Sequence, residues 1–257
     1  MFTFNSIPKS YMSSPSRVFA ILDLFTEENP IWQPDKINEV LGYSRPTGYR
    51  YVKELVEAGL LQKVAAGRYS LGGRIIALDY QLRQTDPVLS AADPVMRKLA
   101  ASTKFDAALS VMFAGPQVID VHRVSAEKNL HLSYGRGRPR PLFLAASPKI
   151  LLAHLPRNSL KKIYATHAKE IGLNGMGDTW QEFLSVLTKI RKDGFYRSQG
   201  ELEPGLGAVA VPIFNAEGDC VAALALVGSV QRFDTGLNAR LLSSLQEASA
   251  VICRSLG

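Results

Sequence analysis

The chain has 257 residues, a length that predicts about two domains, each large enough to bury a hydrophobic core. Hydrophobic residues make up 46% and charged residues 21%, which is typical of globular proteins and excludes a mainly disordered chain. No apolar run reaches the ~18 residues of a membrane span, the N-terminus lacks the pattern of a secretory signal, and two cysteines are too few for a disulfide framework. We therefore expect a soluble, cytoplasmic protein.

The net charge of +7 is unevenly distributed along the chain. Residues 1–80 hold nine Lys and Arg against eight Asp and Glu, a net charge of only +1. Residues 121–162 hold nine basic residues against Glu127 alone, a net charge of +8. The total charge therefore does not by itself predict nucleic-acid binding, and such a prediction must rest on the local arrangement of residues.

Three short helices are predicted in the N-terminal segment. The first begins at Ser14 and Pro15, which form a capped start with proline at the first helical position. The second spans residues 34–41, and the third spans residues 45–58 with Ser44 as its N-cap. Because only a short turn separates the second helix from the third, the pair is predicted to form a helix-turn-helix.

A two-stranded hairpin over residues 60–71 follows these helices, with a tight turn at residues 65–67. Three helices and a hairpin make a winged helix-turn-helix. Guanidinium groups suit guanine edges and phosphates, while hydroxyls and rings suit other groove contacts. The predicted DNA-binding residues, from the third helix and the hairpin, are Ser44, Arg45, Pro46, Thr47, Tyr49, Arg50, Lys53 and Arg68.

Two alternative interpretations of this module remain open. Its charges could form a solvated surface of a small helical domain, and Gly48 is a poor residue for a helix interior. The winged helix could also be a protein-interaction module. The cluster of Arg45, Arg50 and Lys53 on one exposed face favours DNA over both alternatives.

Residues 42–79 resemble the DNA-binding segment of the IclR family of bacterial transcriptional regulators. The residues at matching positions are Thr47, Arg50, Leu55, Gly59, Tyr69, Leu71 and Gly72. The resemblance implies a winged helix-turn-helix domain over residues 1–72, a linker helix over 73–85, and an effector-binding and oligomerisation domain over 86–257. It also implies a homodimer or homotetramer, in which apolar residues of the linker helix pack against a partner subunit.

The C-terminal region changes between helical and strand periodicity, which predicts an α+β domain. In chain order, its predicted elements are helix starts at Asp86-Pro87 and Asp93-Pro94, strands over 109–113 and 118–124, helices over 148–155 and 180–193, strands over 208–214 and 220–228, and a closing helix over 237–252.

The IclR resemblance continues through this region, in residues 130–149 and 191–228. It implies a GAF-like effector-binding domain, with a curved antiparallel sheet and a pocket for a small molecule. The effector-binding residues that it implies are Leu130, Leu132, Arg140, Ala146, Ser147, Ser198, Ala208, Ala225 and Val227.

The chain departs from the family pattern by losing polar groups at this pocket. Ala208 stands where the family often has cysteine, Ala225 and Val227 replace two serines, and residues 141–144 are bulky. A small polar keto acid would leave its polar atoms unpaired in such a pocket. We therefore expect an aromatic or otherwise hydrophobic acid from a catabolic pathway, with Arg140 or a neighbouring arginine pairing with its carboxylate.

These features together predict a ligand-responsive DNA-binding transcriptional regulator. Two recognition helices of a dimer would bind a roughly palindromic double-stranded operator with half-sites about 34 Å apart. The alternative is a metabolite-binding protein whose winged helix binds another protein. We expect no membrane partner and no cofactor.

Other signals in the sequence are weaker. Residues 136–139 resemble an AT-hook, although their position between a strand and a helix favours a loop at the pocket or at a subunit contact. Motifs of the common enzyme classes are absent, so we expect no catalytic activity. The four histidines have no metal-ligand spacing, and we expect no metal site at His122, His131, His154 and His167.

Overall fold

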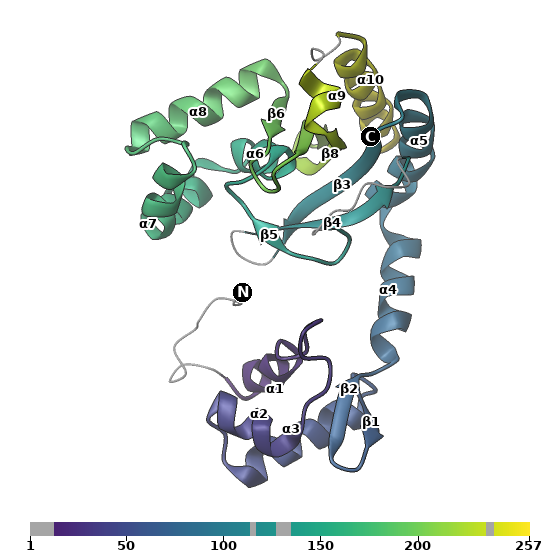
Figure 1. Cartoon of the computed structure of the whole chain (residues 1–257), viewed down its shortest axis with the longest axis vertical. Helices are drawn as coiled ribbons and strands as arrows, with labels where there is room; N and C mark the ends of the chain where they lie inside the picture. Colours follow the sequence, from purple (N-terminus) through teal and green to yellow (C-terminus); the bar gives the residue numbers. More distant parts are fainter. Residues whose placement is uncertain (1–12, 114–116, 127–134, 235–238) are drawn as a thin grey trace. The chain divides into compact units, whose positions relative to one another are not determined.

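The computed structural model describes residues 13–113, 117–126, 135–234 and 239–257 (Figure 1). The chain divides into two compact units, Met1–Thr85 and Asp86–Gly257. Each unit has its own hydrophobic core, so each is described by itself.

The described part of the N-terminal unit is a winged helix-turn-helix, as predicted. Its elements are α1 (Ser14–Leu22), α2 (Pro34–Leu41), α3 (Arg45–Glu57), β1 (Leu61–Ala65), β2 (Arg68–Leu71) and α4 (Arg74–Thr85). Strands β1 and β2 pair in antiparallel fashion, and Trp32 forms a bridge with Tyr69 on the other edge of β2. The core of the unit consists of Ile21, Ile37, Tyr51, Val52, Leu55 and Leu61.

The ends of the first helix differ from the prediction. The N-cap is Ser13 rather than Ser14, because the Ser13 hydroxyl accepts a hydrogen bond from the Ser16 amide. The helix ends at Leu22, before the end of the apolar segment that suggested it. Beyond this end, the indole N–H of Trp32 donates to the Leu24 carbonyl over 2.8 Å and holds the chain in a turn.

The start of the recognition helix α3 agrees with the prediction in position. Ser44 is its N-cap residue, and Pro46 lies in the first turn, where a missing amide breaks no helical hydrogen bond. The Ser44 hydroxyl donates to the Thr47 hydroxyl over 2.9 Å instead of capping a backbone amide. Gly42 ends the preceding helix α2 with a φ of 69°.

Helices α2 and α3 approach each other closely at Gly48. A Cβ atom at this position would overlap Asn38 Oδ1. The Asn38 amide is buried, and neither its oxygen nor its nitrogen has a hydrogen-bond partner. The close approach explains why α3 carries a glycine that helix propensity alone disfavours.

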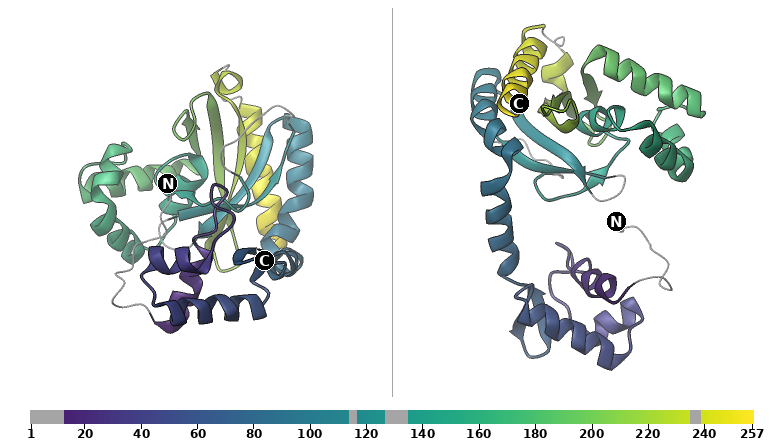
Figure 2. Two further views of the ribbon diagram at one scale, coloured as in Figure 1. Left: turned by 60° about the horizontal axis from the view of Figure 1, so that its bottom comes forward. Right: turned by 180° about the vertical axis from the view of Figure 1, so that it is seen from behind.

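The C-terminal unit contains a six-stranded antiparallel sheet, which curves in Figure 2. Its strand order is β5-β4-β3-β8-β7-β6. The strands are β3 (Asp106–Phe113), β4 (Gln117–Val124), β5 (Arg140–Pro141), β6 (Tyr196–Gln199), β7 (Leu206–Phe214) and β8 (Cys220–Ser229). The helices are α5 (Pro87–Thr103), α6 (Ala146–Ala153), α7 (Arg157–Leu173), α8 (Trp180–Asp193), α9 (Val230–Asp234) and α10 (Ala239–Ser255).

Helices cover both faces of this sheet (Figures 1 and 2). Helices α5 and α10 pack on one face, where Leu224 and Leu226 of β8 contribute to their core. Helix α6 packs on the other face, where Ala223, Ala225 and Val227 of the same strand contribute. Because both faces are covered, the central strands are buried along most of their length.

The prediction of two helix starts near residue 90 is wrong in part. Asp86 caps α5 as expected, since its carboxylate accepts hydrogen bonds from the Val88 and Leu89 amides. Asp93 and Pro94 lie inside the same helix, which continues to Thr103. The Asp93 carboxylate instead binds Arg97 and His122, at 2.8 and 2.7 Å.

Three further elements, β5, α7 and α9, have no counterpart in the sequence-based prediction. Strand β5 is only two residues long, α9 only five, and α7 buries only Leu160 and Ile171, so none has a strong periodic pattern. Gly172 lies in the last turn of α7. Helix α8 ends as predicted at Gly194, which has a φ of 71°.

The contact between Gly48 and Asn38 predicts that Gly48→Ala has opposite effects on stability in the wild-type protein and in an Asn38→Ala variant. Gly48→Ala should destabilise the N-terminal unit by about 1–3 kcal/mol, because the added methyl group overlaps the buried Asn38 amide. In an Asn38→Ala background, the same change should stabilise the unit by about 0.5–1 kcal/mol through helix propensity. Urea unfolding followed at Trp32, with Trp180 replaced by Phe, measures both effects. Equal effects in the two backgrounds would contradict the contact.

Candidate DNA-binding surface and effector site

The predicted DNA-binding residues of α3 lie on the surface of the N-terminal unit. Gly48, Tyr51, Val52 and Leu55 are buried, so the opposite side of the helix faces solvent. Thr47 is half-buried, and Tyr49 is 42% exposed. The other predicted residues of this helix and of the hairpin are exposed: Ser44, Arg45, Pro46, Arg50, Lys53 and Arg68.

The cationic groups of this surface have weak, exposed partners. Arg45 Nε lies 3.3 Å from Asp35 Oδ1, and Lys53 Nζ lies 3.6 Å from Glu57 Oε1. A hydrogen bond with Tyr49, followed by the charge of Asp35, raises the pKa of Arg45 further above its usual value. Exposed ion pairs contribute at most ~1 kcal/mol, so phosphate groups can replace these carboxylates at small cost.

A hollow of about 510 Å³, which we call the α3 hollow, lies along one side of the recognition helix. Its lining residues are Pro34, Tyr49, Arg50, Val52, Lys53, Val56, Glu57 and Tyr69. Tyr49, Arg50 and Lys53 are among the predicted DNA-binding residues, whereas Glu57 and Tyr69 are not. Glu57 lies one helical turn after Lys53, so helical periodicity could have included it.

The structure brings most of the predicted effector residues together on the face of the sheet that α6 covers. In adjacent strands, Ser198 of β6 lies opposite Ala208 of β7, which lies opposite Val227 of β8. Ala225 shares the face of Val227, as the two-residue spacing predicts. Ala146 packs into the same core cluster from α6, and Ser147 beside it is also buried. Leu130 and Leu132 lie outside the described residues.

Arg140 lies inside the unit and already has protein partners. Its guanidinium forms an ion pair with the buried Asp120 and donates to the Ser110 hydroxyl over 2.9 Å. The Ser110 hydroxyl also donates to Asp120 over 2.6 Å. The guanidinium that was predicted to pair with an effector carboxylate therefore already has a counter-charge in the protein. The neighbouring Arg136 donates to the Val121 carbonyl over 3.0 Å.

A second charged cluster, which was not predicted from the sequence, lies beside α6. Lys149 is buried among apolar residues of this helix, and its ammonium donates to Glu201 over 2.7 Å and to the Tyr196 hydroxyl over 3.0 Å. Glu201 also accepts hydrogen bonds from the Tyr196 hydroxyl and from the Ala145 amide, each over 3.0 Å. A lysine within a segment of otherwise buried residues is the signal that could have revealed the cluster.

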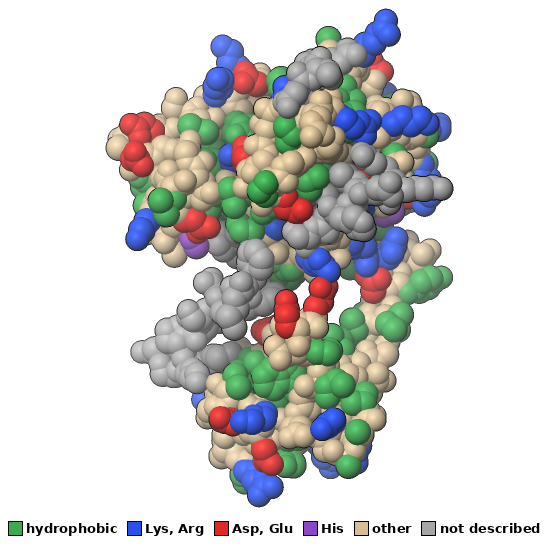
Figure 3. All heavy atoms as spheres, viewed as in Figure 1, with side chains coloured by type: hydrophobic (Ala, Val, Ile, Leu, Met, Phe, Trp, Pro, Cys, Tyr) green, Lys and Arg blue, Asp and Glu red, His purple; other side chains and the backbone are tan. Residues whose placement is uncertain are grey.

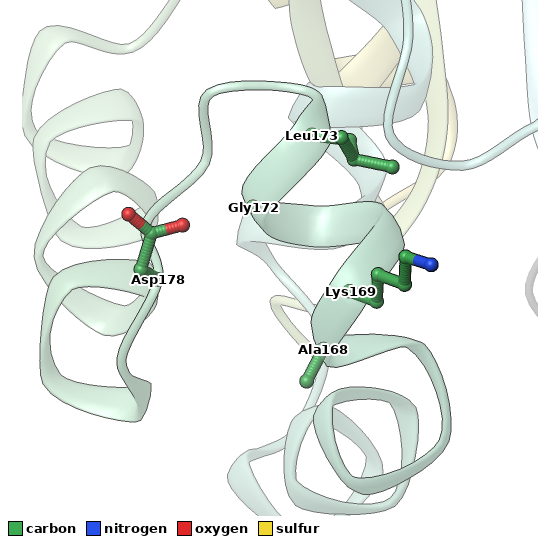
Figure 4. Close-up of a pocket in the computed structure, with 5 residues that line it drawn as sticks. All are labelled: Ala168, Lys169, Gly172, Leu173 and Asp178. Atoms are coloured by element: carbon green, nitrogen blue, oxygen red, sulfur yellow. The ribbon is translucent and has the colours of Figure 1, made fainter.

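Another hollow, of about 440 Å³, lies between α7 and the start of α8 (Figure 4). Its lining residues are Ala168, Lys169, Gly172, Leu173 and Asp178. None of the predicted effector residues lines it.

The surface of α4 is unusual for a helix of a folded unit. No residue of α4 is buried, and Ile76, Tyr80 and Leu82 are each more than 60% exposed. Hydrophobic side chains follow one another along this helix in Figure 3. Exposed apolar side chains of this size are typical of a helix that another chain covers.

The described residues give no sign of a metal site or a membrane span. Within them, no group of three His, Cys, Asp or Glu side chains could hold a metal ion. His122 binds Asp93, whereas burial and the charge of Arg191 lower the pKa of His154. None of the helices described is long and apolar enough to cross a bilayer.

Comparisons with known proteins cover nearly the whole chain. Residues 14–65 match the IclR helix-turn-helix domain, and residues 81–254 match the C-terminal domain of the bacterial transcriptional regulator IclR. The chain is 27% identical to the HTH-type transcriptional regulator KdgR of Escherichia coli (strain K12), over 96% of this chain and 93% of that protein. Both matched models describe transcriptional regulators, which agrees with the prediction that the chain is not an enzyme.

Solved structures support the fold. An IclR transcriptional regulator from Alicyclobacillus acidocaldarius has a TM-score of 0.75 at 22% identity, covering 96% of this chain and 100% of that one. An IclR homolog from Microbacterium hydrocarbonoxydans, in complex with 4-hydroxybenzoate, has a TM-score of 0.73 at 22% identity, covering 95% and 99%. These likenesses confirm the predicted α+β architecture.

The buried Arg140 pair predicts a large loss of stability when its acid is removed. Asp120→Asn should lower the free energy of unfolding of the C-terminal unit by about 3–5 kcal/mol, because it leaves a buried guanidinium without its counter-charge. Asp193→Asn removes an exposed carboxylate and should change stability by less than about 0.5 kcal/mol. Urea unfolding followed at Trp180 measures both variants. A loss no larger than in the control would contradict a structural role for the pair.

Proposed function

Because the chain belongs to the IclR family of bacterial transcriptional regulators, we propose that it controls genes of a catabolic pathway in response to a hydrophobic organic acid. In this proposal α3 binds the operator, and the α6 side of the sheet binds the effector. The effector changes transcription only if it binds the DNA-competent and DNA-incompetent states with different affinities.

The exposed row of polar and cationic side chains on α3 is the observation that carries the DNA-binding part of the proposal. Arg45, Thr47, Tyr49 and Arg50 are near the N-terminal end of the helix, which enters the major groove in helix-turn-helix proteins. We assign base contacts to these four residues. Lys53, further along the helix, and Arg68, on the hairpin, are assigned to phosphates.

The exposed apolar side chains of α4 support assembly of two or more copies. Burying Ile76, Tyr80 and Leu82 against a second chain would remove exposed apolar surface at ~25 cal/mol per Å². A dimer with two-fold symmetry presents two recognition helices, and its operator is then roughly palindromic.

The composition of the sheet face supports a hydrophobic effector. Ala208, Ala225 and Val227 offer no side-chain hydrogen bonds, so a ligand lying against them must have an apolar surface. The homolog from Microbacterium hydrocarbonoxydans binds 4-hydroxybenzoate, an aromatic acid. We therefore propose an aromatic acid, held near Ala146 and Ser147 of α6, with its carboxylate paired with Arg140 beside Asp120.

Substitution of Arg50 tests the assignment of base contacts. Arg50→Ala should weaken binding to duplex DNA from upstream of the protein's own gene by about 1–3 kcal/mol, and it should reduce discrimination against random duplex of equal length. Lys36→Ala, which removes an exposed cation from α2, is the control and should leave discrimination unchanged. Fluorescence anisotropy at fixed salt measures both. Undiminished discrimination in Arg50→Ala would remove the residue from the interface.

Ligand-induced thermal stabilisation tests the effector class. Saturating 4-hydroxybenzoate should raise the melting temperature of the C-terminal unit, whereas pyruvate should not, because its polar atoms would be unpaired. The variant Ala225→Ser/Val227→Ser should lose stabilisation by 4-hydroxybenzoate, since it places hydroxyl groups beneath the ring. Stabilisation of the wild-type protein by short polar keto acids alone would contradict the proposal.

A further inference from the structure

We propose that the α3 hollow receives one phosphodiester and its deoxyribose from the DNA backbone, and that Glu57 limits DNA affinity by competing with this phosphate for Lys53. The inference rests on the proposed function, because it requires that α3 faces DNA. It assigns to Glu57, the exposed partner of Lys53, a role that weakens DNA binding.

The walls of the α3 hollow have the chemistry of a DNA backbone site. Arg50 and Lys53 bring two exposed cations to it. Val56 and Tyr69 add apolar surface, which suits the carbon atoms of a deoxyribose. Pro34 is the first residue of α2, so the positive end of that helix dipole also lies at the hollow.

Glu57 is the one acidic residue among those that line the hollow. Its carboxylate lies 3.6 Å from the Lys53 ammonium, one helical turn away, and both side chains are more than half exposed. A phosphate bound to Lys53 would therefore lie close to a like charge, which weakens binding. Replacing Glu57 by a neutral isostere removes this repulsion and frees the ammonium.

The surrounding surface favours DNA over an acidic protein segment as the occupant. The hollow shares Tyr49, Arg50 and Lys53 with the proposed base-contacting and phosphate-contacting face. Arg45 and Arg68 extend the cationic surface along α3 and onto the hairpin. Cations on two elements suit the repeated charges of a duplex better than a single acidic side chain.

The test compares two glutamates on the same helix in the full-length protein. Glu54 is exposed on α3 but does not line the hollow, so Glu54→Gln is a control with the same change of charge. Affinity is measured for a random duplex of about 30 base pairs between about 50 and 200 mM salt. We expect Glu57→Gln to tighten binding about two- to fivefold at low salt for each bound protomer, and Glu54→Gln to tighten it less than half as much.

Lys53 provides the second arm of the experiment. Lys53→Gln should weaken binding uniformly across sequences and reduce the slope of log affinity against log salt by about one for each protomer. In a Lys53→Gln background, Glu57→Gln should tighten DNA binding no more than Glu54→Gln does. The reason is that this background has no Lys53 ammonium for which Glu57 and the phosphate could compete.

The possible outcomes separate this inference from the proposed function. If the wild-type protein binds duplex DNA with a steep salt dependence but Glu57→Gln equals Glu54→Gln, the hollow does not receive a phosphate and only the inference fails. A gain that persists without Lys53 overturns it as well, since the competition for Lys53 is then absent. If the wild-type protein binds no duplex under these conditions, both the inference and the proposed function are overturned.

Discussion

The close packing of α2 against α3 is the constraint on which the DNA-binding surface depends. Gly48 lets the two helices approach until only the Asn38 amide lies between them, and Tyr51, Val52 and Leu55 then turn inward on the same side of α3. A helix with inward positions at i, i+3, i+4 and i+7 presents the side chains of its opposite side to solvent. The outward direction of Arg45, Arg50 and Lys53 is therefore a result of core packing and not of their charge.

In the C-terminal unit, helices cover both faces of the sheet, and the size of the sheet's side chains differs between the two faces. The small side chains Ala208, Ala210 and Ala225 lie under α6, whereas leucines fill the space under α5 and α10. Small residues let a helix lie close to a sheet, and they also leave few groups with which a polar ligand could form hydrogen bonds. Ala208 and Ala225, which support a hydrophobic effector in the proposal, therefore also let α6 pack closely on the sheet.

The sequence predicted those features that arise from local patterns. The helix ends at Gly42 and Gly194 follow from their left-handed backbone, and the apolar segments 109–113, 118–124, 208–214 and 220–228 predicted strands β3, β4, β7 and β8. Contacts between residues distant in sequence were not predicted: Arg140 meets Asp120 only across paired strands, and Lys149 meets Glu201 only once α6 has packed on the sheet. Helix α7 escaped prediction because so few of its residues are buried.

The cluster of Lys149, Tyr196 and Glu201 has a mechanical consequence. One carboxylate joins the start of α6 to the loop after β6, and it does so at Ala145, whose φ of 71° is unfavourable for a residue other than glycine. Moving either element alone would leave the buried Lys149 ammonium without its counter-charge, Glu201, at a cost of about 3–5 kcal/mol. A shift of one segment without the other is therefore energetically disfavoured.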